Sequence, residues 1–228
     1  MDNASKALRI AGAVLLGLMV TSLLLFAHST WTKYQKTNIE TLQNEQATKF
    51  NASFDVYNKK ALRGSDLVSL GNKLNSTNRA TAGEPDYNMY DKSDAVKKNM
   101  NYRYPETDLM PVRAFVEFHN NSSGYPVNTA PLSTLPGIDY YIPDLLGDDY
   151  YGPLVTTYSY AGSNYYIDLD EYIQKIYNND KLHDLVKEHG QDNRKVFKGY
   201  YFECTGVEFD NRNGRYCRLY FKQVYKIN

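Results

Sequence analysis

The residues that most often do chemistry in proteins are few in this chain. Its four histidines are His28, His119, His183 and His189, and none belongs to an HExxH motif. His183 and His189 are six residues apart, so they do not share a helix face. No phosphate-binding loop, GxGxxG or GxSxG motif occurs. We therefore expect no catalytic residue, no metal centre on histidine and no cofactor, and we do not expect an enzyme.

Oxygen-rich clusters are the remaining candidates for a metal site. Asp148 and Asp149 are adjacent, and Asp168, Asp170 and Glu171 form a second group. Calcium prefers such carboxylate oxygens, so either cluster is a candidate calcium site. The competing interpretation makes the first cluster a loop tip and the second the N-cap of a helix.

Two cysteines, Cys204 and Cys217, are too few for a zinc ribbon, but an exported domain permits a disulfide. If Asp210 lies opposite Arg215 in a hairpin, the two sulfurs are ~13 Å apart along the ladder. A disulfide needs its Cα atoms within ~7 Å. A regular hairpin therefore predicts free thiols, whereas a wide loop over residues 206–214 would allow the bond.

The chain is electrically neutral and rich in tyrosine. Its 228 residues include 26 basic and 26 acidic side chains, which does not favour nucleic acid as a partner. The 22 tyrosines outnumber the 9 phenylalanines. Tyrosine packs its ring and keeps a polar tip in water. The surplus suits core packing, a partly exposed β-surface, or a surface that holds a partner or a carbohydrate.

Residues 10–27 (IAGAVLLGLMVTSLLLFA) form one uncharged apolar stretch, and the rest of the chain follows it. As a helix it spans ~27 Å, close to the ~30 Å hydrocarbon core of a bilayer. It has no polar face to turn towards water, and it is longer than the apolar run of a typical secretory signal. We predict a transmembrane helix; the alternative is a signal peptide cleaved near Ala27-His28-Ser29.

The charges beside this stretch bear on its orientation. Lys6 and Arg9, in a short head of residues 1–9, favour a cytoplasmic N-terminus. Lys33 and Lys36 reduce the asymmetry, but a long domain is translocated largely regardless of its charge. We expect a single-pass protein of the cell membrane, with the lipid bilayer as a partner and the C-terminal domain extracytoplasmic.

Residues 28–62 continue the helical period as a stalk. No proline occurs between Ile10 and Leu62, so one long helix is predicted. A bare apolar stripe on this helix would be an association site, so it must be covered by the protein's own domain or by neighbouring copies. The predicted packing face of the stalk consists of Ile39, Leu42, Phe50, Phe54 and Tyr57.

Residues 63–228 are predicted to form the globular α+β domain. A helix with Leu67, Leu70 and Leu74 on one face starts at Ser65-Asp66. Alternating apolar residues predict an antiparallel sheet ending in a C-terminal β-hairpin. The expected elements are a loop over 75–94, strands over 112–118 and 164–168, helices after Asp168 and after Asp180, and hairpin arms over 196–210 and 215–225 around an Asn211–Gly214 turn.

Residues 125–165 combine prolines with tyrosines. The prolines forbid long helices, so the segment is expected to be extended and irregular. It is either a packed covering loop or a functional surface. The tyrosines of the candidate ligand or partner surface are Tyr140, Tyr141, Tyr150, Tyr151, Tyr158 and Tyr160.

The order of a basic head, one apolar helix, a stalk and an α+β head resembles that of type IV pilin-like and pseudopilin proteins. Residues 50–74 (FNASFDVYNKKALRGSDLVSLGNKL) look like the stalk of single-pass proteins associated with Tad-type pili of Gram-positive bacteria. A prepilin usually has an early glutamate in its apolar helix, and residues 10–27 have none. The resemblance therefore implies a surface or assembly component more than a major pilin.

These observations lead to three functional hypotheses. The first is a membrane-anchored structural or assembly component of a bacterial cell-surface system, whose partners are other envelope proteins or copies of itself. The second is a membrane-tethered extracytoplasmic module that binds a glycan or a peptide through residues 125–165. The third is an enzyme of a type that no sequence motif reveals.

Overall fold

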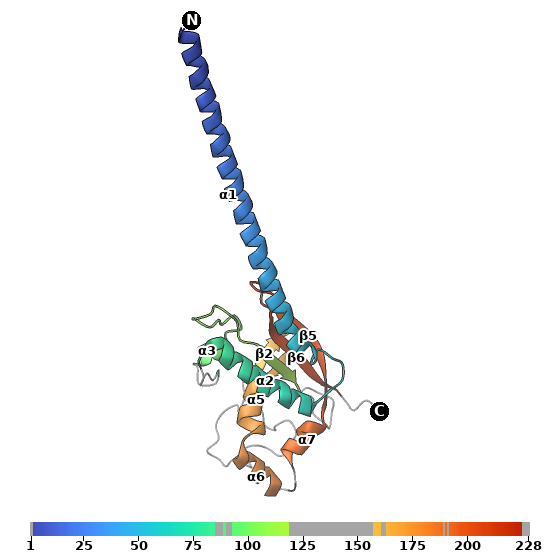
Figure 1. The fold of residues 1–228 in the computed structure, drawn as a ribbon. Coiled ribbons are helices and arrows are strands. Elements are labelled where there is room, and N and C mark those ends of the chain that lie inside the picture. The colour runs from blue at the N-terminus through green and yellow to red at the C-terminus, as the bar shows by residue number, and fades with distance from the viewer. Residues whose placement is uncertain are drawn as a thin grey trace. The chain divides into compact units, whose positions relative to one another are not determined.

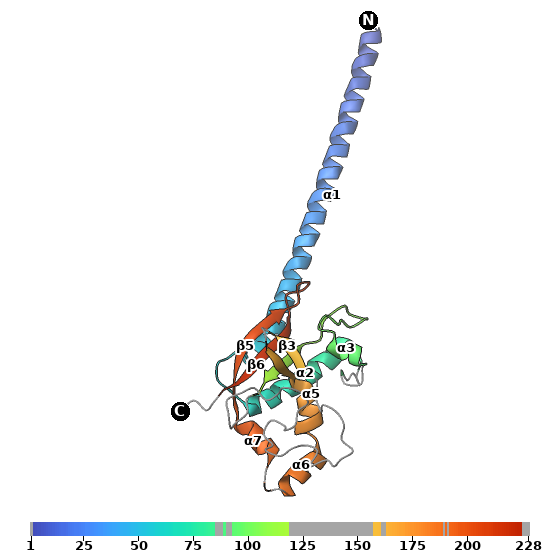
Figure 2. The same ribbon diagram turned by 180° about the vertical axis from the view of Figure 1, so that it is seen from behind.

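The computed structural model describes residues 2–84, 89, 93–118, 157–160, 163–188, 190 and 192–224; for residues 94, 157–160 and 163–165 it describes the backbone. The chain divides into two compact units, Met1–Lys49 and Phe50–Asn228. The architecture is α+β with a long N-terminal helix, as the sequence predicts, and its sheet is mixed. Figure 1 shows the elements and Figure 2 shows them from behind.

The first unit consists of α1, which runs over Asp2–Asp55 and continues into the second unit. Among the described residues, α1 is the one helix long and apolar enough to cross a membrane, and none of its apolar window is buried. Two hydroxyl groups lie within that window. Thr21 Oγ1 donates to the Gly17 carbonyl at 2.7 Å, and Ser22 Oγ donates to the Leu18 carbonyl at 2.5 Å. Their hydrogen bonds are therefore satisfied within the helix.

Helix α1 ends at Asp55, before the end near Leu62 that the sequence pattern predicts. The Tyr57 amide donates to the Phe54 carbonyl, and the Asn58 amide donates to the Asp55 carbonyl, which closes the helix in a turn. Leu62 pairs instead with Phe202 as part of strand β1 (Leu62–Arg63). Sheet pairing therefore overrides the helical propensity of these residues.

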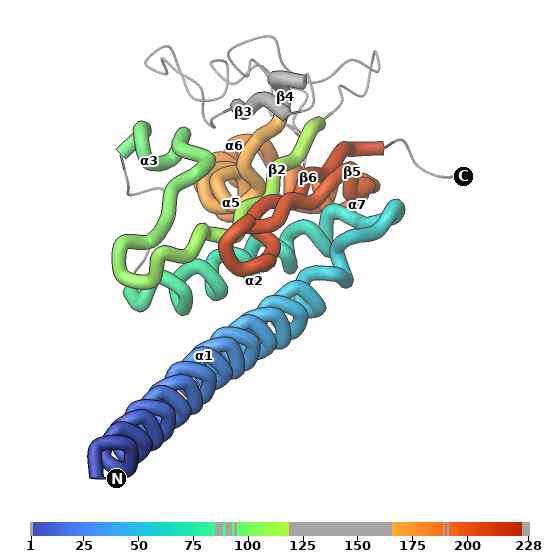
Figure 3. The backbone as a smooth tube through the Cα atoms, turned by 90° about the horizontal axis from the view of Figure 1, so that it is seen from above, coloured from blue at the N-terminus to red at the C-terminus, as the bar shows by residue number. Residues whose placement is uncertain are grey.

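The sheet has the strand order β1-β5-β6-β2-β4-β3. The predicted C-terminal hairpin is confirmed as β5 and β6, which pair antiparallel. The predicted antiparallel sheet is found in part: four of the five pairings between described strands are antiparallel, but β2 pairs parallel with β6, so the sheet is mixed. Figure 3 shows β2 and β6 side by side. The remaining strands are β2 (Arg113–Glu117), β3 (Thr157–Tyr160), β4 (Ser163–Asp168), β5 (Tyr201–Phe209) and β6 (Tyr216–Val224).

The main hydrophobic core lies on one face of this sheet, beneath α2 (Gly64–Ala82) and the helical segments that follow β4. Helix α2 contributes Leu67, Leu70 and Leu74, all fully buried, which confirms the predicted apolar face. Strand β2 contributes alternate residues, because successive side chains point to opposite faces. These core residues at and beside β2 are Val112, Ala114, Val116 and Phe118.

Helix α2 extends to Ala82, where the sequence pattern predicts a loop after Leu74. Asn78 explains the difference, because its buried amide forms two hydrogen bonds with Val112. Its Nδ2 donates to the Val112 carbonyl at 2.9 Å, and its Oδ1 accepts from the Val112 amide at 2.9 Å. A polar residue at the predicted helix end therefore pairs with the backbone just before β2. Helix α3 (Asp94–Lys98) begins at the last residue of the predicted loop.

The start of α2 also differs from the prediction. The helix begins at Gly64, and Asp66 lies at its third position, where Asp66 Oδ2 accepts a 2.8 Å hydrogen bond from the Arg63 amide. The carboxylate therefore caps the helix from inside its first turn.

Two helical regions between β4 and β5 agree with the sequence pattern. Asp168 caps α5 (Leu169–Tyr172), which continues as the π-helix η2 (Ile173–Tyr177). Helix α6 (Asp180–Glu188) follows. The third helix, α7 (Asn193–Gly199), begins where Asp192 accepts from the Lys195 amide, so residues 196–199 are helical and not part of the hairpin arm. The side-chain cap overrides the strand pattern there.

Candidate functional site

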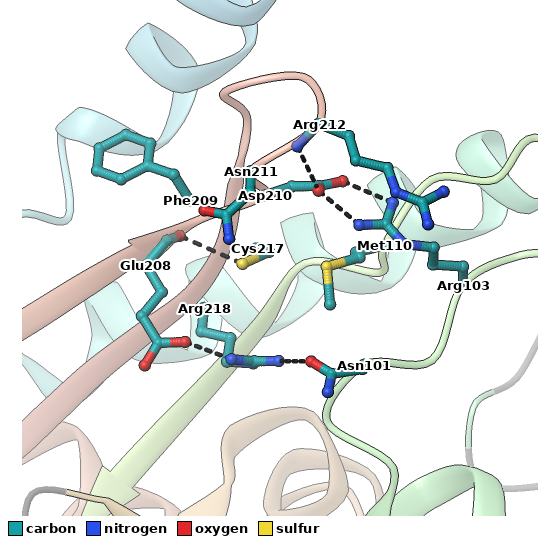
Figure 4. A pocket seen from close by; sticks show the side chains of 10 residues that line it. All are labelled: Asn101, Arg103, Met110, Glu208, Phe209, Asp210, Asn211, Arg212, Cys217 and Arg218. Carbon is teal, nitrogen blue, oxygen red and sulfur yellow. Dashed lines mark hydrogen bonds and ion pairs between the residues drawn. The ribbon is translucent and has the colours of Figure 1, made fainter.

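The described part of the second unit has an open pocket of about 630 Å³ beside the β5–β6 turn. Figure 4 shows its lining, which comes from the end of the hairpin and from the segment before β2. Most of the lining side chains are polar or charged. The lining residues are Asn101, Arg103, Met110, Glu208, Phe209, Asp210, Asn211, Arg212, Cys217 and Arg218.

The hairpin turn itself is built around Asp210. The Asp210 amide donates to the Arg215 carbonyl, and the Gly214 amide donates to the Asp210 carbonyl, both at 2.8 Å. Gly214 has φ 69°, a conformation that glycine adopts without strain. The Asp210 carboxylate also accepts from the Arg212 amide and from Asn213 Nδ2. These bonds fix the carboxylate at the pocket wall.

Arg103, from the segment before β2, completes this arrangement beside Asp210 (Figure 4). Its guanidinium forms a bidentate pair with Asp210, with N···O distances of 2.9 and 2.6 Å, and it also donates to the Asp108 carbonyl. The Asp210 side chain is only 2% exposed. Burial raises the pKa of Asp210, but the hydrogen bond from Arg103 and the other donors outweigh burial, so the net pKa is lowered. The pair with Asp210 raises the pKa of Arg103.

A second charged pair lies deeper along the hairpin. Arg218 pairs with Glu208 on the neighbouring strand. It also donates to the Met100 carbonyl and to Asn101 Oδ1, so it joins β6 to the segment before β2. Tyr220 adds a hydroxyl hydrogen bond to Glu208 at 3.2 Å. Figure 4 shows Glu208, Arg218 and Asn101 in one line.

The third arginine of the pocket is at its rim. Arg212 pairs with Asp108, and both side chains are largely exposed, at 63% and 65%. Each of the three arginines therefore has a carboxylate partner. Because opposite charges are matched in this way, the pocket offers a polar lining rather than a strong field of one sign.

Cys217 lines the pocket and could act as a nucleophile only as a thiolate, but its environment keeps the thiol protonated. Its thiol donates to the Glu208 carbonyl at 3.4 Å. Burial, above all, raises the pKa of Cys217 to about 11, so little thiolate exists near neutral pH. Burial also raises the pKa of Cys204. Both cysteines are free thiols in the structure, as the regular hairpin predicts.

No group of three or more His, Cys, Asp or Glu side chains within the described residues could hold a metal ion. In the acidic cluster at 168–171, Asp168 caps α5 and forms a buried pair with Arg113 at 2.8 Å. Glu171 pairs with Lys175 at 2.6 Å. These contacts support the helix-capping interpretation of the cluster rather than a calcium site. Asp148 and Asp149 lie outside the described residues.

The predicted packing face of the stalk divides into two parts. Phe54 is fully buried, and Phe50 and Tyr57 pack against the main core of the second unit. Ile39 and Leu42 are 54% and 58% exposed. Within the second unit, the core therefore covers the C-terminal part of the face, Phe50, Phe54 and Tyr57.

Polar contacts hold the end of α1 within the second unit. Asn51 Nδ2 donates to the Gly214 carbonyl at 2.9 Å, and Asn51 Oδ1 accepts from the Tyr216 amide at 2.7 Å. Tyr216 donates its hydroxyl to Asp55 at 2.6 Å. Arg215 lies 3.6 Å from the centre of the Phe50 ring, in cation–π geometry. The hairpin turn therefore contacts α1 on one side and lines the pocket on the other.

The tyrosine surface stays a prediction. Tyr140, Tyr141, Tyr150 and Tyr151 lie outside the described residues. Tyr158 and Tyr160 lie in β3, whose backbone alone is described.

The charged pocket was missed by sequence reasoning. Arg103 and Asp210 are 107 positions apart, and no local pattern links them. A weak signal existed in the Asp210-Asn-Arg-Asn-Gly214 run, because an aspartate opening such a turn often accepts backbone hydrogen bonds. Arg218 offered another signal, since it interrupts the apolar residues of its strand.

Comparison with known proteins adds no relative to this description. No protein-family model matches the chain, and no curated protein or solved structure matches it.

Proposed function

We propose that this protein is anchored once in a bacterial cell membrane by α1 and presents its α+β domain outside the cytoplasm, as a structural or assembly component of a pilin-like surface system. The observation that carries the proposal is the apolar window of α1, none of which is buried. A core helix of a soluble protein would hide most of such a window. The internal hydrogen bonds of Thr21 and Ser22 are compatible with a hydrocarbon environment.

The role in assembly is supported by Ile39 and Leu42. These residues lie beyond the apolar window and remain exposed. Exposed apolar side chains at neighbouring positions on one helix face favour association with another protein. The occupant we propose is another envelope protein or a second copy of this chain.

Membrane fractionation tests the anchoring. The full chain should remain in the membrane pellet after washes with high salt and with alkaline carbonate. Protease added to spheroplasts should digest the domain. A mature protein that is soluble and starts near Thr30 would overturn the anchoring, and protection from external protease would overturn the orientation.

Site-directed crosslinking tests the assembly role. In a background with Cys204→Ser and Cys217→Ser, we expect Ile39→Cys and Leu42→Cys to form crosslinks in intact membranes. Asn44→Cys is the matched control, because it lies on the opposite side of α1 at 100° per residue. Equal crosslinking at all three positions, or none at any, would contradict a specific contact.

A second candidate function is a membrane-tethered module that binds a glycan or a peptide. The pocket of about 630 Å³ favours it, because its guanidinium and amide groups suit polar ligands. Arrays of soluble glycans and peptides should then retain the purified chain, and Arg212→Ala should weaken retention because Arg212 lies at the rim. Retention that is unchanged in this variant would exclude the pocket as the binding site.

A further inference from the structure

Two aromatic side chains lie just beyond the apolar stretch of α1. Trp31 and Tyr34 are one helical turn apart, and their ring centroids are 6.4 Å from one another. They are 62% and 61% exposed. Neither residue belongs to the apolar run or to the stalk packing face, so both require a separate explanation. Tryptophan and tyrosine are enriched where a membrane meets water, because one part of each side chain is apolar and another is polar.

Their distance from the apolar stretch agrees with the thickness of the interfacial layer. Trp31 is four residues after Ala27, which is ~6 Å along a helix. The layer between hydrocarbon and water is ~5–7 Å thick on each side of a bilayer. When residues 10–27 fill the hydrocarbon core, Trp31 therefore lies within this layer. The Tyr34 backbone lies ~10 Å from Ala27, a few ångströms beyond the outer limit of the layer, so the Tyr34 ring enters the layer only if its side chain points back towards the lipid.

The direction of helical side chains brings both rings closer to the lipid. In an α-helix the Cα–Cβ bonds tilt towards the N-terminus, so a long side chain covers the turn before its own Cα. After the apolar stretch this direction leads back to the hydrocarbon. Before the stretch, at Lys6 and Arg9, it leads away from the hydrocarbon. Long side chains therefore point towards lipid after the apolar stretch and away from it before the stretch. Trp31 and Tyr34 are at the end where this direction favours contact with lipid.

The charges around the rings fit phospholipid headgroups. No acidic residue occurs between Asn3 and Ile39. Lys33 and Lys36 lie on the other side of the helix from the rings at 100° per residue, and Lys36 has a loose, exposed pair with Glu40 at 3.9 Å. Lysine side chains extend along apolar surface and keep the ammonium group in the headgroup region.

We propose that Trp31 and Tyr34, flanked by Lys33 and Lys36, form an interfacial anchor that sets the depth of α1 in a phospholipid bilayer, with both rings in the headgroup and carbonyl layer. The proposal rests on the membrane anchoring proposed above. It adds a specific lipid-contact surface and a fixed position of the helix along the membrane normal.

Trp31 is the only tryptophan of the chain, so its fluorescence reports this depth without a label. The full chain is reconstituted into vesicles whose lipids carry bromine atoms near the ester carbonyls or near the middle of the acyl chains. We expect blue-shifted emission, and stronger quenching by bromine near the carbonyls than by bromine near the middle of the acyl chains. Acrylamide in the water should quench the emission only weakly.

Three variants with a relocated tryptophan calibrate the depth. Each carries Trp31→Phe together with Phe26→Trp, Tyr34→Trp or Asn44→Trp; Asn44 is exposed and lies on the side of α1 opposite the proposed association face. Mid-chain bromine should quench Phe26→Trp most, whereas acrylamide should quench Asn44→Trp most. Tyr34→Trp should lie between Trp31 and Asn44→Trp. If Trp31 behaves like Phe26→Trp or like Asn44→Trp, the interfacial anchor is excluded.

Flotation of the same vesicles separates the two proposals. If the protein floats with the vesicles and Trp31 is quenched as in the hydrocarbon or as in water, the anchoring stands and the interfacial anchor is wrong. If the protein does not float, the membrane anchoring itself is wrong.

Discussion

Arg103 and Asp210 give the clearest case in which one pair of side chains joins distant parts of the domain. We expect Arg103→Ala to lower the free energy of unfolding by about 3 kcal/mol, because it leaves the Asp210 carboxylate buried without its cation. Arg212→Ala is the matched control, since the Arg212–Asp108 pair is exposed and should contribute less than about 1 kcal/mol. Denaturant unfolding of the purified chains in detergent measures both, and equal effects would contradict this explanation.

The same carboxylate predicts a dependence of stability on pH. The pKa of Asp210 is lower in the folded protein than its ordinary value, because Arg103 and other donors outweigh burial. Its stabilising contribution is therefore complete above the unfolded pKa of about 4 and disappears as the pH falls through the folded pKa. Thermal melts should show the wild type more stable than Asp210→Asn at pH 7, with the difference shrinking below about pH 4. A difference that persists at pH 2 would argue against ionisation as the cause.

Cys217 should be unreactive while the protein is folded. A pKa of about 11 lowers its thiolate population roughly a hundredfold relative to an ordinary cysteine. We expect iodoacetamide at pH 8 to leave Cys217 unmodified in the native chain and to modify both cysteines after unfolding without reductant. Mass spectrometry distinguishes the products. A need for reductant before alkylation would reveal a disulfide with Cys204.

At the scale of elements, the packing of α2 on α7 depends on a glycine. A Cβ atom at Gly64 would come within 1.8 Å of the Phe197 carbonyl oxygen. Gly64→Ala must therefore move one helix away from the other, and we expect a loss of about 3 kcal/mol in the free energy of unfolding.

Gly199→Ala is the control for this prediction, because nothing lies within 4 Å of its added Cβ. Its stability should be unchanged or raised by up to about 1 kcal/mol, since alanine favours the helix. If the two substitutions had similar effects, the close approach at Gly64 would not limit the packing.

Elements with local patterns could be predicted from the sequence, and elements set by distant contacts could not. The alternation over Val112–Phe118 and the turn at Asn211–Gly214 identify β2 and the hairpin. The last part of α2 was missed because Asn78 is buried by hydrogen bonds to Val112, 34 positions away. The strand predicted at Val196 was wrong because Asp192 caps a helix there. The pocket depends on the Arg103–Asp210 pair, which only the fold reveals.

At the scale of the whole molecule, the proposed anchor depends on the uninterrupted apolar character of α1. Leu18 lies near the middle of the apolar stretch, where an arginine costs about 3 kcal/mol for membrane insertion. We expect Leu18→Arg to lower the fraction of chain that resists carbonate extraction, and Leu18→Ala to leave it nearly unchanged. Equal retention of both variants would mean that this stretch does not hold the protein in the membrane.

The position of β6 determines when the domain can fold during synthesis. Strand β6 joins β1 and β5 on one side to β2, β4 and β3 on the other, and its residues 218–222 pair with residues 113–117. A nascent chain that lacks β6 therefore has two separate half-sheets with open edges, while α1 has already left the ribosome. Because residues 113–117 pair with residues 218–222, completion of the sheet must wait until β6 is made. A nonsense mutation shortly before Tyr216 would thus give an unfolded, aggregation-prone domain rather than a smaller stable one.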